Sequence, residues 1–349
     1  MRPPRPTPLA AAGGPASPER TAWLVLICAQ GAVVGLGMTV FQVCHLPLIK
    51  QRFAADEAVA TVALAMAISC YGIGGIVGNT LGGVVVESLG VGAAYAVELG
   101  LGLVALVLVL LVPIEEDDEG EEESQERARE EEQMAEEEQT ANCASLCSNK
   151  EYLGIILVTV FSNLFYWCLV PFIQVIASRL GTTPSEAGLL ASATGWGNLL
   201  GALTVVALPP RRIGLTFVGG ALSASLFFAA AAVRSYAVVL LGLFVASVGG
   251  GLFGATQSTL VMLSLPPSQH GLGMGILSAA IGAQAAGMLM LGEIGSYFDQ
   301  SVGLVEGPSY TVLSLAAAGV VTQAGSWCAL PQLSRVTTKT TAVPAETKP

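Results

Sequence analysis

The chain is 349 residues long, with 53% hydrophobic and 12% charged residues and a mean hydropathy of +0.66. Soluble domains carry roughly 25% charged residues, so this composition excludes a soluble globular protein and indicates an integral membrane protein. The formal net charge of −11 arises in residues 115–138, which hold 15 acidic residues and two Arg. The rest of the chain holds 13 Lys and Arg against 11 Asp and Glu. No basic face for nucleic acid remains.

Residues 1–21 are rich in Pro, Ala and Arg and are predicted to form a disordered tail. A bilayer core about 30 Å thick needs about 20 apolar residues per helix. Helices are favoured over barrel strands because the blocks are continuously apolar and lipid offers no backbone partners. Nine such blocks follow the tail: 22–45, 58–83, 91–114, 152–177, 186–208, 213–233, 236–263, 271–295 and 309–331.

The acidic segment divides the nine blocks into three and six. Like charges at this density repel one another and bury no apolar surface, so residues 115–150 are predicted to be a solvated linker. A calcium site is not favoured, because the segment lacks the alternating ligands and turn glycine of a calcium loop. The expected organisation is a three-helix part over 22–114, the linker, a six-helix bundle over 151–332 and a tail over 333–349.

The distribution of Lys and Arg favours an outer N-terminus and an inner linker and C-terminus. The three Arg before the first span argue for the reverse orientation. With the favoured orientation the outer segments hold five basic residues, Arg2, Arg5, Arg20, Arg179 and Arg234. The inner segments hold ten: Lys50, Arg52, Arg127, Arg129, Lys150, Arg211, Arg212, Arg335, Lys339 and Lys348.

The sequence contains no pattern typical of an enzyme or of a metal centre. Cys143 and Cys147 are four residues apart without a nearby His, so ordinary thiols are favoured over a metal site. No phosphate-binding glycine loop is present, and the chain's only two histidines, His45 and His270, lie at the ends of apolar blocks. We therefore expect no enzymatic activity, no cofactor and no metal.

Glycine patterns suggest an internal repeat, since the first three blocks resemble the last three. Gly35 and Gly37, then Gly82 and Gly83, then residues 87–90 have counterparts at 249–251, 271–275 and 292–295. Transporter folds are often built from such repeats. Chance similarity among Gly-rich helices is the alternative.

Residues 72–83, Gly-Ile-Gly-Gly-Ile-Val-Gly-Asn-Thr-Leu-Gly-Gly, are similar to the antiporter signature in the fifth helix of the major facilitator superfamily. The signature ends Gly-Pro-x-x-Gly-Gly; Gly78, Gly82 and Gly83 match it, and Asn79 replaces the Pro. A second resemblance is Arg211 and Arg212 in 209–214, which stand where the family's second half repeats its basic inner loop. The resemblance covers about residues 22–332 and makes the nine blocks the family's fourth to twelfth helices.

The resemblance implies an all-α, MFS-like helical bundle whose central cavity is lined by blocks 22–45, 152–177 and 236–263. Polar side chains within lipid face protein or water. The candidate substrate-binding residues are Gln42, Ser162, Asn163, Tyr166, Trp167, Gln174 and Gln257, and Gln30, Thr256 and Ser258 share these blocks. The alternative for each is a hydrogen bond to a neighbouring helix.

The group from Ser162 to Trp167, followed by Pro171, is the favoured site, because Pro leaves a carbonyl unpaired at a helix bend. Proton coupling needs an acid in the pathway. Glu98, about two turns into its block, is the candidate, with a position at the headgroup layer as the alternative. Glu87 and Glu293 lie near outer helix ends.

These features predict a multi-pass transporter of a small solute working by alternating access, in the plasma membrane rather than an organelle. The first three family helices have no counterpart. We expect that two chains assemble, that the gene model is incomplete, or that the protein does not transport. The alternative function is a non-transporting membrane scaffold. The expected partners are the lipid bilayer, a small solute and, for a nine-helix chain, a second copy.

Overall fold

The computed structural model describes residues 57–111, 146, 148–208, 210–266, 269–303 and 305–329. Every element in these ranges is helical, which confirms the predicted fold class. The chain divides into two compact units, Met1–Ala60 and Thr61–Pro349, and the following description concerns the second. The predicted block 22–45 lies outside the described residues.

The described residues contain seven helical segments long and apolar enough to cross a membrane, and a shorter apolar stretch over Val91–Ala105. They correspond to the other eight predicted blocks. The elements are α2 (Glu57–Leu89), α3 (Val91–Leu111), α5 (Lys150–Phe165), η2 (Trp167–Leu169), α6 (Ile173–Leu180), α7 (Pro184–Ala207), α8 (Ile213–Phe228), η3 (Ala229–Ala232), α9 (Tyr236–Ser264), α10 (His270–Ile281), α11 (Ala283–Val302) and α12 (Gly307–Ala329).

Two predicted boundaries are wrong. The block predicted to end at residue 83 continues to Leu89, because apolar Val84, Val85 and Val86 carry the helix on to Gly90, whose φ of +86° ends it. The block predicted to end at residue 295 continues to Val302 and is interrupted at Gly282. The polar residues after 295 remain helical beside the start of α12.

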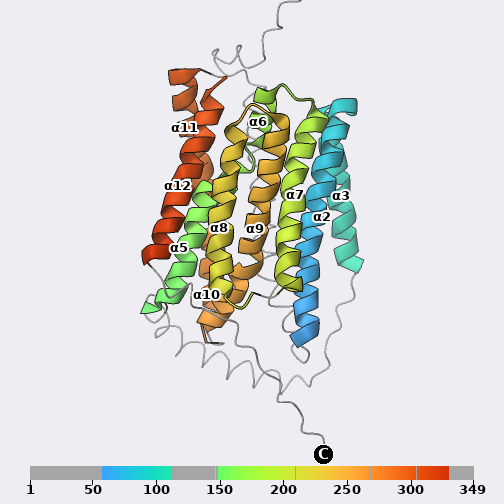
Figure 1. Cartoon of the computed structure of the whole chain (residues 1–349). Coiled ribbons are helices and arrows are strands. Elements are labelled where there is room, and N and C mark those ends of the chain that lie inside the picture. The colour runs from blue at the N-terminus through green and yellow to red at the C-terminus, as the bar shows by residue number, and fades with distance from the viewer. Residues whose placement is uncertain are drawn as a thin grey trace, which may run out of the picture. The chain divides into compact units, whose positions relative to one another are not determined.

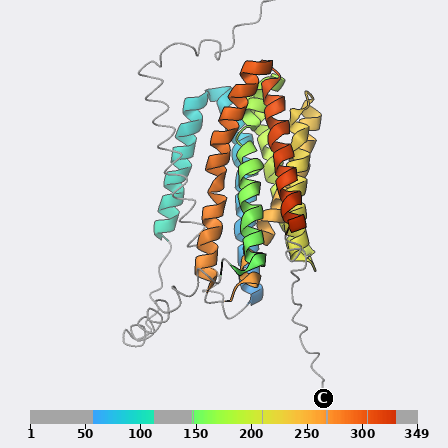
Figure 2. The same cartoon turned by 90° about the vertical axis from the view of Figure 1, so that its left-hand side faces the viewer.

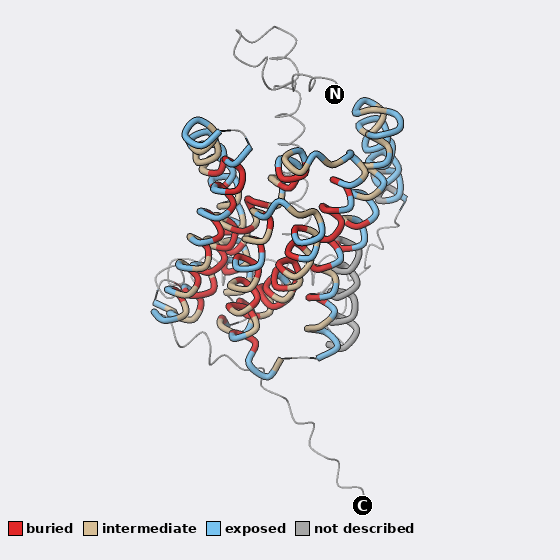
Figure 3. Tube along the Cα trace, turned by 45° about the horizontal axis from the view of Figure 1, so that its top comes forward, coloured by how far each residue is buried: buried red, intermediate tan, exposed pale blue. Residues whose placement is uncertain are grey.

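Helices α5 to α12 pack side by side in a bundle, with α9 between α7 and α8 (Figure 1). Helix α5 contacts α10, α11 and α12 on another side of the bundle, as the rotated view also shows (Figure 2). Buried positions run along the bundle in the burial view, whereas α3 is exposed along almost its whole length (Figure 3). Exposed apolar residues such as Leu99 and Leu101 suit contact with lipid tails.

Three consecutive glycines in α9 each face a different neighbour, because successive helical residues are rotated by about 100°. A Cβ at Gly249 would lie 2.6 Å from the carbonyl oxygen of Gly220 in α8. A Cβ at Gly251 would lie 2.2 Å from that of Asn198 in α7, and one at Gly250 would meet the hydroxyl of Tyr166. The triplet therefore lets α7 and α8 approach α9 at backbone contact and leaves room for the side chain of Tyr166.

Local capping residues fix where the main helices begin. Asn149 Oδ1 accepts hydrogen bonds from the amides of Glu151 and Tyr152, and its Nδ2 donates to the carbonyl of Ser264 at the end of α9. Thr183 and Glu186 form a reciprocal capping box at the start of α7. Both helix starts are thereby set by short polar segments between apolar blocks.

Arg179, at the end of α6, ties three helix ends together. Its guanidinium donates to the carbonyls of Ala231, Ala232 and Val233 at the end of η3, and to the hydroxyl of Ser309 in the first turn of α12. A planar fork of five N–H donors suits such a set of acceptors. Arg179 thus serves as a shared cap.

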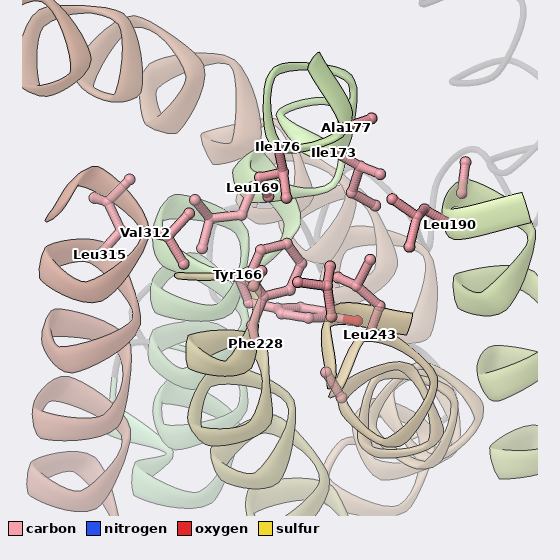
Figure 4. Close-up of a cluster of buried hydrophobic side chains, with 14 of the residues drawn as sticks. Tyr166, Leu169, Ile173, Ile176, Ala177, Leu190, Phe228, Leu243, Val312 and Leu315 are labelled. Atoms are coloured by element: carbon pink, nitrogen blue, oxygen red, sulfur yellow. The ribbon is translucent and has the colours of Figure 1, made fainter. Parts of the chain in front are cut away.

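Two apolar clusters fill the bundle. One surrounds Tyr166, whose ring packs edge-on against Phe228 with centroids 5.9 Å apart, and includes Leu169, Ile173 and Leu243 (Figure 4). The other lies toward the opposite ends of the helices, around Tyr152 and the stacked rings of Phe217 and Phe253. The clusters place the interrupted middle of the α5–α6 span within a close-packed bundle.

The glycine contacts give a stability prediction. Gly201→Ala places a methyl group 2.2 Å from the carbonyl oxygen of Val248, which forces α7 and α9 apart. Overpacking typically costs about 1–3 kcal/mol, so we expect a melting temperature in detergent lower by about 5 °C. Gly219→Ala is the control, because its Cβ would have no neighbour within 4 Å. Equal melting temperatures for the two variants would contradict the packing argument.

Candidate functional site

The span from α5 to α6 is interrupted halfway, where the sequence predicted a bend near Pro171. The α-helix ends at Phe165, a 3-10 turn runs over Trp167–Leu169, and regular helix resumes at Ile173. Proline lacks the N–H that would continue the hydrogen-bond ladder. The predicted bend is therefore confirmed, and it begins about one turn before the proline.

Tyr166 lies at this interruption and is 1% exposed. Its hydroxyl is 3.3 Å from Ser247 Oγ of α9, and its ring meets Trp167 edge-on at 5.1 Å. Trp167 itself is half-buried. The two predicted aromatic residues therefore differ in burial. Tyr166 lies in the core, and Trp167 lies at the border of the core.

The interruption is braced by the neighbouring span, which is interrupted as well. Helices α10 and α11 meet at Gly282, and Gln284 Nε2, in the first turn of α11, donates to the carbonyl of Trp167 at 3.2 Å. One turn later, a Cβ at Gly287 would lie 2.6 Å from the carbonyl oxygen of Leu164. Gln284 thus adds a second donor to the Trp167 carbonyl, which also accepts from the amide of Val170 in the 3-10 turn.

Several predicted substrate residues hydrogen-bond neighbouring helices, which was the alternative left open. Gln257 Nε2 of α9 donates to Thr159 Oγ1 of α5 at 2.8 Å. Gln323 Nε2 of α12 donates to Ser162 Oγ at 3.3 Å and to Ser225 Oγ of α8 at 3.1 Å. These bonds join α5 to α8, α9 and α12. Contact of Ser162 or Gln257 with a solute stays a prediction.

The remaining predicted polar residues are placed differently. Asn163 is buried and donates to the carbonyl of Thr159 in its own helix, and Thr256 likewise bonds its own helix. Gln174 is exposed on α6 and Ser258 is half-buried on α9. Gln30 and Gln42 lie outside the described residues.

Sequence reasoning missed Asn198 of α7. Its Oδ1 is buried without a hydrogen-bond partner among the described residues. A Cβ at Gly250 would lie 3.0 Å from this oxygen and 2.8 Å from the hydroxyl of Tyr166, so both polar atoms converge on the same glycine. A polar residue between Gly197 and Gly201 was the available signal, but α7 was not expected to line the cavity.

The glycine motif of α2 forms a seam with α7. A Cβ at Gly83 would lie 3.1 Å from Cα of Gly188, and one at Gly188 would lie 2.5 Å from the carbonyl oxygen of Asn79. Gly78 and Gly82 face away, since their Cβ atoms would meet nothing within 4 Å. Gly83 and the Asn79 backbone are therefore the motif residues at the contact.

Hydroxyl groups and a second close approach extend the seam. Ser192 Oγ lies 2.7 Å from Thr80 Oγ1 and donates to the carbonyl of Ile76 at 3.1 Å. Further along, a Cβ at Gly72 would lie 3.2 Å from Cβ of Leu199. The contact pairs run in opposite directions along the chain, so α2 and α7 pack antiparallel.

The predicted charged candidates lie away from the interrupted spans. Arg211 and Arg212 are exposed just before α8, and Glu98 is exposed on α3. A role for Glu98 in coupling remains a prediction. Within the described ranges, no group of three or more His, Cys, Asp or Glu could hold a metal ion.

A bundle of long apolar helices with interrupted spans and buried polar contacts defines a polytopic helical membrane protein. Residues 8–151 and 155–341 match the model of the Major Facilitator Superfamily, and the chain belongs to that family. Membership agrees with the expectation that it is not an enzyme. No solved structure matches the chain.

Among its relatives are two proteins named uncharacterized MFS-type transporters, from the CDC 1551 and H37Rv strains of Mycobacterium tuberculosis. Each is 34% identical over 142 residues. The match covers 39% of this chain and 32% of the relative, so this chain is similar to about a third of each relative's length.

The bond between the interrupted spans gives a second prediction. Gln284→Ala removes the side-chain donor to the Trp167 carbonyl, a loss of about 1 kcal/mol. The backbone bond from the amide of Val170 remains. We expect faster hydrogen exchange in peptides covering residues 166–172, measured by mass spectrometry in detergent. Gln300→Ala, an exposed Gln in the same helix, should leave that exchange unchanged. Unaltered exchange in Gln284→Ala would show that the turn is held without this bond.

Proposed function

We propose that the protein carries a small solute across a membrane by alternating access, the working mode of secondary transporters in which helix groups rock about a midplane site. The observation that carries the proposal is the meeting of two interrupted spans at the Gln284–Trp167 bond. In transporters such discontinuous helices supply binding groups, because their backbone polar groups are freed from the helical ladder.

The proposed solute site comprises the groups at the Gln284–Trp167 contact and Asn198 of α7, whose Oδ1 converges with the Tyr166 hydroxyl on Gly250. Trp167 offers a half-buried ring, Gln284 an amide, and Asn198 an acceptor oxygen with no partner among the described residues. An unpaired buried acceptor costs about 1–3 kcal/mol. A hydrogen-bond donor on the solute would recover this cost. A water molecule would do the same before the solute displaces it.

The sequence bears on the kind of solute. Residues 152–177 and 236–263, the spans predicted to line the cavity, contain no Asp, Glu, Lys or Arg, and neither do residues 187–208 of α7. Recognition by the groups of these spans would rest on neutral hydrogen bonds and aromatic contact. This favours an uncharged polar or amphipathic solute at this part of the site. The plasma membrane remains the proposed location.

Transport by purified protein in proteoliposomes tests the proposal. We expect wild-type vesicles to take up at least one neutral solute of a broad panel faster than protein-free vesicles do. Asn198→Ala and Trp167→Ala should lower that uptake about tenfold, equivalent to about 1.4 kcal/mol. Gln300→Ala, exposed on α11, is the control. Asn163→Ala is measured beside them, because Asn163 is a predicted candidate whose amide donates to its own helix.

Two results would oppose this proposal. Wild-type vesicles that are indistinguishable from empty ones across the panel would favour the non-transporting scaffold. Uptake that survives Asn198→Ala and Trp167→Ala but is lost in Asn163→Ala would move the solute site away from the border and into the bundle core.

A further inference from the structure

The seam between α2 and α7 continues beyond the glycine motif to the C-terminal end of α2 and the N-terminal end of α7. Its contact positions on α2 recur every three or four residues, as do those on α7, which is the spacing of helices packed at a small crossing angle. The α2 positions are 72, 76, 79, 80, 83 and 87, and they meet 199, 195, 192, 188 and 185 of α7.

Glu87 forms the last contact of this seam. Its Oε2 accepts a hydrogen bond of 3.0 Å from the backbone amide of Ser185, the second residue of α7. The carboxylate also interacts with the hydroxyls of Ser185 and Thr183. Glu87 is the sole ionisable side chain among the seam positions named above.

The local cap of α7 leaves the amide of Ser185 without an acceptor. This is the amide that donates to Glu87. Pro184 has no N–H, Glu186 N donates to Thr183 Oγ1, and Ala187 N donates to the Thr183 carbonyl. The amide of Ser185 has no acceptor within its own helix. A carboxylate at a helix N-terminus is further stabilised by the helix dipole. The end of α7 is therefore completed by a different helix.

We propose that Glu87 is a latch that holds these ends of α2 and α7 together and biases the alternation between states. The inference rests on the proposed function, in which α2 belongs to the helices before the acidic linker and α7 to those after it. The predicted orientation places both ends on the outer side. With the latch closed, the seam is sealed on that side.

The contact between Glu87 and Ser185 is weak enough to break and form again as the helix ends separate and close. Glu87 and Ser185 lie near the surface, so water can replace either partner when the ends separate. The Gly83–Gly188 approach below it has no polar side chain of its own and depends on the helices staying close. Glu87 therefore adds a polar and charged contribution to a seam that is otherwise held by close packing and hydroxyl groups.

Distances between spin labels at Leu89→Cys and Leu189→Cys, both exposed positions, test the latch by double electron–electron resonance. The other cysteines are replaced and the full chain is used. The unmutated seam should give a short-distance population. Glu87→Ala should shift the ratio of short to long distances roughly fivefold toward long ones, the size expected for loss of one helix cap.

Glu87→Gln keeps an acceptor oxygen without the charge and should fall between wild type and Glu87→Ala. Ser88→Ala is the control, because Ser88 donates to Val84 in its own helix. Size-exclusion profiles identify any variant that fails to fold. A folded Glu87→Ala protein with the wild-type distance distribution would overturn the proposal, as would an equal shift in Ser88→Ala.

The measurement separates this proposal from the proposed function because it needs no solute. A shifted distribution with no uptake of any solute would leave the latch in place and remove transport. Uptake of a solute by the wild-type protein, together with unshifted label distances in Glu87→Ala, would support transport and contradict the latch.

Discussion

Close approach of helix backbones at glycine is the constraint on which the bundle depends. Apolar side chains gain little by leaving lipid tails for other apolar side chains, so helices associate through contact at small residues and through hydrogen bonds. Helix α9 meets α7 and α8 through glycines on two of its faces, and its third central glycine leaves room for Tyr166. Enlarging Gly249 or Gly251 displaces a helix, whereas enlarging Gly250 displaces the side chain of Tyr166 or Asn198.

The same constraint explains where the polar groups lie. A polar side chain that finds no water must bond another helix or its own backbone. Gln257 and Gln323 bond α5, while Asn163 and Thr256 bond their own helices. The bonds of Gln257 and Gln323 thereby link four of the spans after the linker, those of α5, α8, α9 and α12. The groups assigned to a solute in the proposed transport function lie at the border of these linked spans.

The sequence could predict that the spans exist, because apolar length alone identifies them, and it could predict the bend near Pro171 from the missing N–H. It could not predict which way each polar residue faces. These helices are apolar on all sides, so no stripe marks their inner face. Asn163 and Asn198 look alike in sequence. Only the contacts of α5 and α7 distinguish the bonded amide of Asn163 from that of Asn198, whose oxygen has no partner within the described part of the chain. The break at Gly282 has no proline and gives no comparable signal.

Arg179 has a consequence for how the bundle meets membranes of different thickness. By joining the ends of α6, η3 and α12, its guanidinium fixes three spans at a common depth. A single helix cannot slide to match a thinner or thicker hydrocarbon layer without breaking that set of bonds. The bundle must instead tilt as a unit or deform the lipid around it. Mechanical stress from a mismatched bilayer would then act on these three spans together rather than on one helix at a time.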